Sequence, residues 1–267
     1  MRIYEPEFFE ESNNFFINTG RKNLLIFRNA GRGLLISLES LLLSFRFLHR
    51  RKEIGKQLYT TGIKSFAVTS VVALFTGMIL SLQAGIILRD VGQEVNVGTL
   101  VAQTMCREMG PFMTALILAA SVGAAIAAEI GTMTVAEEID ALHTMSINPA
   151  DYLVMPRMIA MLIMAPVLTI YTNVVGILGG MLIAKTQLGV APIAYYNNAM
   201  MTLANKEIYV GLLKSIVFGF IIVTVCCYRG FATTNGAVGV GKATRTSVVH
   251  NFLLILIIGY FITRIFY

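Results

Sequence analysis

Three stretches of the chain contain no charged side chain and are long enough to cross a membrane. They cover residues 65–88, 109–128 and 158–184. A transmembrane helix needs about 20 apolar residues, so each stretch predicts one span. Two further apolar stretches each hold a single Lys or His: 208–228, which contains Lys214, and 247–263, which contains His250. The pattern predicts an all-α integral membrane fold with five transmembrane helices.

The segment 24–48 has a different pattern, because charged residues interrupt it. Its large apolar residues fall on one stripe of a helix and its serines on another. The first stripe holds Leu34, Leu38, Leu41, Phe45 and Leu48, and the second holds Ser37, Ser40 and Ser44. Such two-sided segments are typical of helices that lie in the membrane interface. Residues 1–23 lack the basic and apolar regions of a secretory signal, and we expect them to form a cytoplasmic N-terminal extension.

The composition agrees with a membrane protein. Hydrophobic residues make up 56% of the chain and charged residues 13%, against about 25% charged residues in soluble domains. The mean hydropathy is +0.71. The three cysteines, Cys106, Cys226 and Cys227, show no CxxC spacing. The sequence therefore predicts neither a disulfide framework nor a metal site.

The distribution of basic residues favours one orientation in the membrane. With a cytoplasmic N-terminus, fifteen of the 21 Lys and Arg residues fall on the cytoplasmic side and five on the other, and Lys214 stays inside the membrane. The positive-inside rule then predicts that the C-terminus lies on the outer side. The net charge of +6 is explained by this topology and by attraction to anionic lipids, so no nucleic-acid partner is expected.

The predicted cytoplasmic connection between the second and third spans is acidic. It holds Glu129, Glu137, Glu138, Asp140 and Asp151 against Arg157 alone. Residues 134–137 have the form of a capping box, which predicts a short helix that continues to about Met145. An acidic helix between two spans suits docking on a basic partner, such as a transport motor. The alternative is a solvated helical hairpin with no partner.

Three charged residues are predicted at the level of the outer leaflet. Arg107 and Glu108 stand at the entrance of the second span, and Lys214 lies about two turns inside the fourth. Charges inside a membrane need partners or water. Two cations and one carboxylate leave one positive charge, which could meet a lipid phosphate. The alternative is a Glu108–Lys214 ion pair that only fixes two helices, and Gln83 could join either network.

Small residues at four-residue intervals predict that helices pack closely. The second span carries Ala119, Gly123 and Ala127 on one face and Ala120, Ala124 and Ala128 on another, and the third span carries Gly176 and Gly180. Packing within the chain is the first interpretation of these faces. A seam between two copies of the chain is the second.

Residues 236–243, GAVGVGKA, nearly match a phosphate-binding loop. That loop also needs a hydroxyl residue at position 243 and a soluble sheet around it. Position 243 is Ala, and the neighbouring segments are predicted spans. We therefore expect the glycines to make a tight cytoplasmic turn.

Several longer motifs make the chain resemble a known family, the MlaE (YrbE-type) permease subunits of bacterial phospholipid ABC transporters that work with MCE proteins. The matching pieces are GMILSLQAG at 77–85, REMGPFMTALILAASVGAAIAAEIGTM at 107–133, VAEEIDALHTMSINPADYLVMPR at 135–157, LLKSIVFG at 212–219 and GVGKATRTSVV at 239–249. The resemblance covers about residues 25–265 and makes 24–267 one permease domain.

The resemblance implies roles for individual residues. Arg107, Glu108 and Lys214, with Leu80 and Gln83 on the first span, would line a lipid cavity at the interface of a homodimer. Glu129, Glu137, Glu138, Asp140 and Met145 would couple the chain to the ATPase. The chain itself would need no cofactor, because ATP and Mg would bind to the ATPase subunit.

The resemblance also implies partners and a location. A cytoplasmic ABC ATPase, an MCE-domain protein on the outer side and, in some relatives, a small STAS-domain protein would assemble with the permease in the bacterial inner membrane, with a periplasmic C-terminus. The expected function is transport of phospholipid between the inner membrane and the MCE carrier, which contributes to outer-membrane lipid asymmetry, and the chain would not be an enzyme. The rival hypotheses are a secondary transporter or channel for a small anionic or amphiphilic solute, and a structural scaffold.

Overall fold

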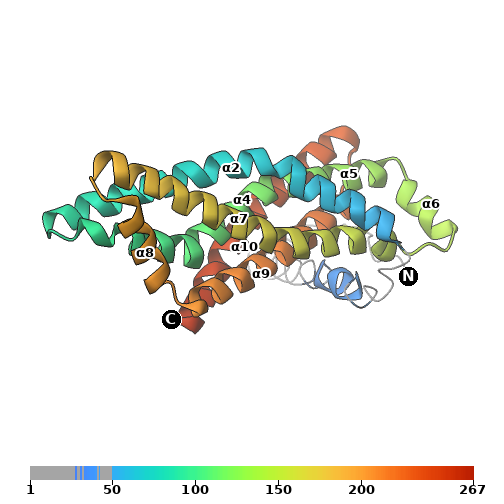
Figure 1. Ribbon diagram of the computed structural model, residues 1–267. Helices are drawn as coiled ribbons and strands as arrows, with labels where there is room; N and C mark the ends of the chain where they lie inside the picture. Colours follow the sequence, from blue (N-terminus) through green and yellow to red (C-terminus); the bar gives the residue numbers. More distant parts are fainter. Residues whose placement is uncertain (1–27, 29–30, 32, 41, 43–49) are drawn as a thin grey trace, which may run out of the picture.

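The computed structural model describes residues 28, 31, 33–40, 42 and 50–267, and its long helices lie side by side in an elongated bundle (Figure 1). In this part of the chain, five helical stretches are long and apolar enough to cross a membrane. They are Arg51–Asp90, Glu94–Val135, Ala150–Gln187, Asn205–Phe231 and Gly236–Phe266. The predicted all-helical fold with five spans is confirmed, and the chain is a multi-pass membrane protein.

The spans are built from these elements: α2 (Arg51–Asp90), η2 (Glu94–Asn96), α3 (Val97–Thr104), η3 (Met105–Met109), α4 (Gly110–Leu118), η4 (Ala119–Gly123), α5 (Ala124–Val135), η5 (Ala150–Val154), α7 (Met155–Gln187), α9 (Asn205–Phe231) and α10 (Gly236–Phe266). Two short helices, α6 (Glu138–Thr144) and α8 (Pro192–Thr202), lie at opposite ends of the bundle (Figure 1). The helices extend beyond the predicted spans, because the charge-free runs mark only the part suited to hydrocarbon.

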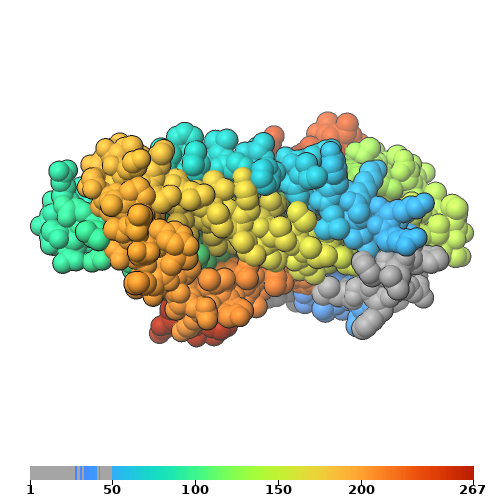
Figure 2. All heavy atoms as spheres, in the orientation of Figure 1, coloured from blue at the N-terminus to red at the C-terminus, as the bar shows by residue number. Residues whose placement is uncertain are grey.

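The most extensive helix contact joins α2 and α7, and glycines make it possible. A Cβ atom on Gly77 of α2 would overlap the backbone carbonyl of Gly176 of α7, and one on Gly179 would overlap the carbonyl of Leu74. In lipid, small residues let backbones approach and gain dispersion contacts. The interpretation of the third-span glycines as packing within the chain is thus confirmed. In Figure 2, α7 is visible along the length of the molecule, next to α2.

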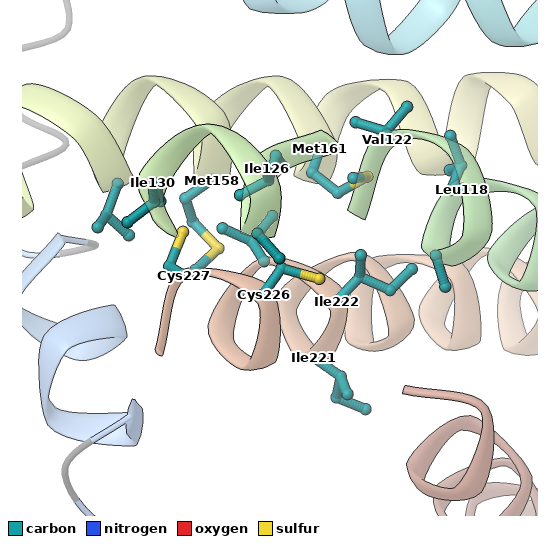
Figure 3. Packing of buried hydrophobic residues seen from close by; sticks show 14 of the residues in the cluster. Leu118, Val122, Ile126, Ile130, Met158, Met161, Ile221, Ile222, Cys226 and Cys227 are labelled. Carbon is teal, nitrogen blue, oxygen red and sulfur yellow. The ribbon is translucent and has the colours of Figure 1, made fainter. Parts of the chain in front are cut away.

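The largest buried cluster lies among the second, third and fourth spans, and its side chains interdigitate in Figure 3. Leu118 comes from α4, Met161 from α7, and Ile222 from α9, and each is almost fully buried. Gly123 supports this packing, because a Cβ there would lie 3.0 Å from Cys226 Sγ. All three cysteines are buried and free.

The expected tight turn at residues 236–243 is wrong, because α10 already begins at Gly236. The chain reverses just before it, where Asn235 and Gly236 have φ values of 66° and 62°. Asn and Gly tolerate this left-handed conformation better than other residues. The reversal therefore takes place at the start of the glycine-rich segment, and the rest of that segment is helical.

The segment predicted to lie in the interface is described only in part, and the extension 1–23 and most of 41–49 fall outside the described residues. Residues 33–40 and 42 are helical. Ser37 and Ser40 of the serine stripe are buried, whereas Leu34 and Leu38 of the apolar stripe are exposed. The small polar face therefore packs on the bundle and leaves the leucines on the outside, where an interfacial helix would meet lipid.

Candidate functional site

The second span contains a wide turn directly before a proline. In this π-helical turn, η3, the N–H of Gly110 donates to the carbonyl of Met105. Pro111 has no N–H to offer to the carbonyl four residues earlier, which belongs to Arg107. That freed carbonyl accepts a hydrogen bond from Lys214 Nζ at 2.9 Å. The break in the helix thus creates an acceptor for a cation inside the bundle.

Lys214 is held by three acceptors, one for each of its N–H bonds. Its Nζ lies 2.7 Å from Glu108 Oε2 and donates to Thr263 Oγ1 at 2.8 Å, in addition to the Arg107 carbonyl. The Thr263 hydroxyl in turn donates to Glu108 Oε1 at 2.9 Å. Lys214 is 1% exposed. We call Arg107, Glu108, Lys214 and Thr263 the charge cluster; it joins η3, α9 and α10.

The Glu108–Lys214 ion pair considered from the sequence is therefore present, and Arg107 is the surplus cation. Arg107 Nε lies 3.6 Å from Glu108 Oε1, and the side chain is 35% exposed. The helical stretch that holds Arg107 and Glu108 begins at Glu94, and the position of these two residues at the entrance of the span stays a prediction. The residues before them also form a helix, since Val101 and Met105 pack on Tyr195 of α8.

The other two residues predicted to line a lipid cavity lie on α2. Leu80 packs partly buried against the cluster that contains Val97 and Val101, and the Gln83 side chain is exposed. Among the hydrogen bonds and ion pairs of the described residues, none joins Leu80 or Gln83 to Lys214 or Glu108. The structure therefore brings three of the five predicted residues together and leaves two on the first span.

Residues near the end of the last span complete the charge cluster, and the sequence alone did not identify them. Thr263 bridges Glu108 and Lys214, and the ring centroid of Tyr267 lies 3.4 Å from Arg107 Cζ. The four-residue spacing of 263 and 267, which places both on one helix face, was the available signal. Burial raises the pKa of Tyr267 and Arg107 opposes this shift only in part, so the ring is neutral near pH 7.

At the opposite end of the bundle lies α6 (Figure 1). Glu137, Glu138 and Asp140 are exposed, and Met145 is 68% exposed, whereas Ile139 is buried and anchors the helix. The predicted short helix is confirmed. The predicted capping box is wrong: Thr134 still belongs to α5 and its hydroxyl bonds to the Ile130 and Gly230 carbonyls, and α6 has no side-chain cap.

Glu129 occupies a different environment from the exposed residues of α6. Its carboxylate lies 2.9 Å from Arg157 Nη2, and the Arg157 side chain is 4% exposed. Arg157 also donates to the Leu153 carbonyl at 2.6 Å. The pair joins the end of the second span to the start of the third. The sequence placed Arg157 in the cytoplasmic connection between these spans, and its burial was not predicted.

The end of this connection is tied to the residues that precede α2. Arg50 Nη2 lies 2.8 Å from Asp151 Oδ2, and the Arg50 guanidinium stands 4.9 Å from the ring centroid of Tyr152. One turn earlier, Asn148 Nδ2 donates to Glu39 Oε1 at 2.8 Å. These contacts attach the end of the connection to residues from the N-terminal part of the chain. Among the described residues, no group of three or more His, Cys, Asp or Glu side chains could hold a metal ion.

Comparison with known proteins gives consistent matches over most of the chain. The family described as permease MlaE matches residues 54–265. A probable ABC transporter permease protein of Rickettsia prowazekii is 40% identical over 79% of this chain and 82% of its own length. The intermembrane phospholipid transport system permease protein MlaE of Haemophilus influenzae is 29% identical over 95% of this chain and 98% of its own. The chloroplastic protein TRIGALACTOSYLDIACYLGLYCEROL 1 of Arabidopsis thaliana is 34% identical over 79% of this chain and 61% of its own.

Proposed function

Because this chain belongs to the MlaE family of ABC transporter permeases, we propose that it moves phospholipids between the inner membrane and an MCE-domain carrier on the outer side. A permease subunit is the non-catalytic membrane component of its transporter, and a separate ATPase subunit supplies the energy. The name of the Haemophilus relative assigns that protein to intermembrane phospholipid transport, which supports a phospholipid cargo here. Transport of this kind would contribute to outer-membrane lipid asymmetry.

The observation that carries the proposal is the unequal state of the two cations in the charge cluster. Lys214 has all three donors engaged and is buried, so it positions the helices. Arg107 is partly exposed and its closest carboxylate contact is 3.6 Å, so its guanidinium can bind a phosphate with two parallel hydrogen bonds. In this proposal Arg107 meets the headgroup, and Leu80 and Gln83 of α2 line the path of the lipid.

Energy would reach the charge cluster from the cytoplasmic end. The exposed carboxylates of Glu137, Glu138 and Asp140 would dock on basic residues of the ATPase, where ATP and Mg bind, and Met145 would add apolar contact. Two copies of the chain would form a homodimer, with the N-terminus in the cytoplasm and the C-terminus in the periplasm. A STAS-domain protein would be an optional addition on the ATPase.

A lipid-binding measurement tests the proposal. The chain is purified with its partners from native membranes, the lipids that accompany it are identified, and ATP-driven lipid transfer is measured after reconstitution. Arg107→Ala is expected to lower phospholipid occupancy and transfer about tenfold, as loss of a charge-assisted hydrogen-bonding cation would. Lys185→Ala removes an exposed cation at the end of α7 and serves as the control. Unchanged occupancy in Arg107→Ala, or transfer without any ATPase, would contradict the proposal.

A second prediction concerns the link between Arg50 and Asp151. Both side chains are largely buried, so the pair should matter more than an exposed salt bridge. Arg50→Glu is expected to reduce lipid transfer per ATP hydrolysed about threefold, because the connection that carries α6 loses its attachment to the first span. The double variant Arg50→Glu with Asp151→Arg should recover part of the loss. Lys52→Glu, an exposed charge reversal on α2, is the control, and equal effects of Arg50→Glu and Lys52→Glu would refute the link.

A further inference from the structure

Tyr267 lies between two cations that come from different spans. Its ring centroid is 3.4 Å from Arg107 Cζ of η3 and 4.6 Å from Lys206 Nζ, in the first turn of α9. Cations are attracted to the electron-rich face of an aromatic ring. In Figure 2, the end of α10 is visible next to the α8–α9 region. Two basic side chains are therefore held around one neutral ring.

Neither Arg107 nor Lys206 forms a close ion pair with a carboxylate among the described residues. Among the described residues, the Arg107 guanidinium has no side-chain hydrogen bond and its carboxylate contact, at 3.6 Å, is to Glu108, which Lys214 already holds at 2.7 Å. Lys206 is exposed. A cation in contact with a ring can still bind an anion, because the ring carries no net charge and does not neutralise the cation as a carboxylate would. The two side chains are available to a ligand that displaces the ring.

The local charge sets the kind of anion. Glu207 follows Lys206 in the same turn and is 8% exposed, and its carboxylate acts electrostatically on Tyr267. Its Oε2 atom has no hydrogen-bond partner among the residues that the structure describes. With Glu108 and Lys214 neutralising each other, Arg107, Lys206 and Glu207 together carry one net positive charge. That balance matches a phosphodiester, which carries one negative charge, better than a phosphomonoester.

From these contacts we infer that Arg107 and Lys206 form a two-cation clamp for the phosphodiester of the cargo lipid, and that the Tyr267 ring occupies this clamp when no lipid is bound. The inference rests on the proposed function and adds a binding residue, Lys206, and a displaceable placeholder, Tyr267. The hydroxyl of Thr263, one turn before Tyr267 on α10, stays bonded in the charge cluster, so only the ring has to move. A lipid headgroup then replaces one set of cation contacts with another.

Three variants of the purified complex test the inference, with a spin-labelled phosphatidylglycerol and an uncharged spin-labelled diacylglycerol as probes. Tyr267→Ala is expected to raise the apparent affinity for phosphatidylglycerol about three- to tenfold, the range that loss of a competing cation–ring contact implies. Tyr267→Phe keeps the ring and should therefore raise the affinity less than Tyr267→Ala does. Lys206→Gln should lower phosphatidylglycerol binding several-fold, and most clearly in the Tyr267→Ala background.

The controls separate this inference from the proposed function. Lys185→Gln removes an exposed cation elsewhere and should leave binding unchanged. Diacylglycerol binding, which depends on acyl chains, should be equal in all variants. If the unmodified complex binds phosphatidylglycerol but Tyr267→Ala binds it equally or more weakly, or Lys206→Gln matches Lys185→Gln, the clamp is refuted and the proposed function stands. If the unmodified complex does not prefer phosphatidylglycerol to diacylglycerol, Arg107 is no phosphate site and both fail.

Discussion

Gly77→Val is expected to leave little folded protein in the membrane. The Cβ of any residue at position 77 would overlap the carbonyl of Gly176, and backbone atoms cannot move aside as a flexible side chain can. Overpacking of a buried contact costs about 1–3 kcal/mol, and here it would separate α2 from α7 along their contact. The yield of monodisperse protein after gentle solubilisation and its thermal midpoint measure the effect.

Gly55 offers a matched control on the same helix. Among the described residues, no atom lies within 4 Å of a Cβ built there, and Gly→Ala inside a helix stabilises by about 1 kcal/mol when nothing obstructs it. Gly55→Ala should therefore keep or raise the thermal midpoint, while Gly77→Ala, a milder change than valine, should lower it. If the two alanine variants behaved alike, close backbone packing would not be what joins α2 and α7.

The charge cluster gives the second large effect. Glu108→Gln removes the carboxylate 2.7 Å from Lys214 and leaves a buried ammonium with neutral acceptors only. Leaving one partner of a buried ion pair unmatched costs about 3–5 kcal/mol, so we expect a strongly lowered thermal midpoint and no measurable lipid transfer. Lys214→Met should lower the thermal midpoint less, because the Glu108 side chain is 36% exposed and Arg107 is already near it.

The double variant Glu108→Gln with Lys214→Met distinguishes positioning from binding. Neither side chain is then charged, so stability should largely return. Because Arg107 is the cation assigned to the headgroup, lipid transfer should return with it. Stability without any transfer would mean that Lys214 itself contacts the cargo. A Lys214→Met variant less stable than Glu108→Gln would contradict the assignment of three acceptors to a buried lysine.

The sequence was sufficient to predict the five spans and the exposed acidic helix, and insufficient for the ends of the helices. Charge-free runs identify hydrocarbon-facing segments, but helix propensity and tertiary contact extend α2 back to Arg51 and α10 back to Gly236. The capping box at 134–137 failed for a related reason. The Thr134 hydroxyl bonds to the carbonyl of Ile130 in its own helix, α5, and to the carbonyl of Gly230 in α9. The second contact joins two spans, so no local sequence pattern predicts it.

The charge cluster was predicted in part, because intramembrane charges are visible in a sequence and their partners are not. The pairing of Glu108 with Lys214 could be proposed from the count of charges. The bridging hydroxyl of Thr263 and the contact of Tyr267 with Arg107 depend on α10 lying against η3 and α9. Similarly, burial of Arg157 depends on its contact with Glu129 across the connection. Such contacts between distant residues leave no periodic pattern in the sequence, so they cannot be predicted from it.

The π-helical turn before Pro111 determines how the second span tolerates changes in length. A π-turn accommodates one more residue than an α-turn, so deleting one residue from 105–109 would convert it to regular helix and leave the two flanking parts of the span facing nearly as before. Val97 and Val101 would then still face Tyr195, and α4 and α5 would keep their places. The turn thus absorbs one extra residue between the part of the span that carries α8 and the part that packs in the bundle, whereas a one-residue deletion from a regular turn would rotate these two parts by about 100°.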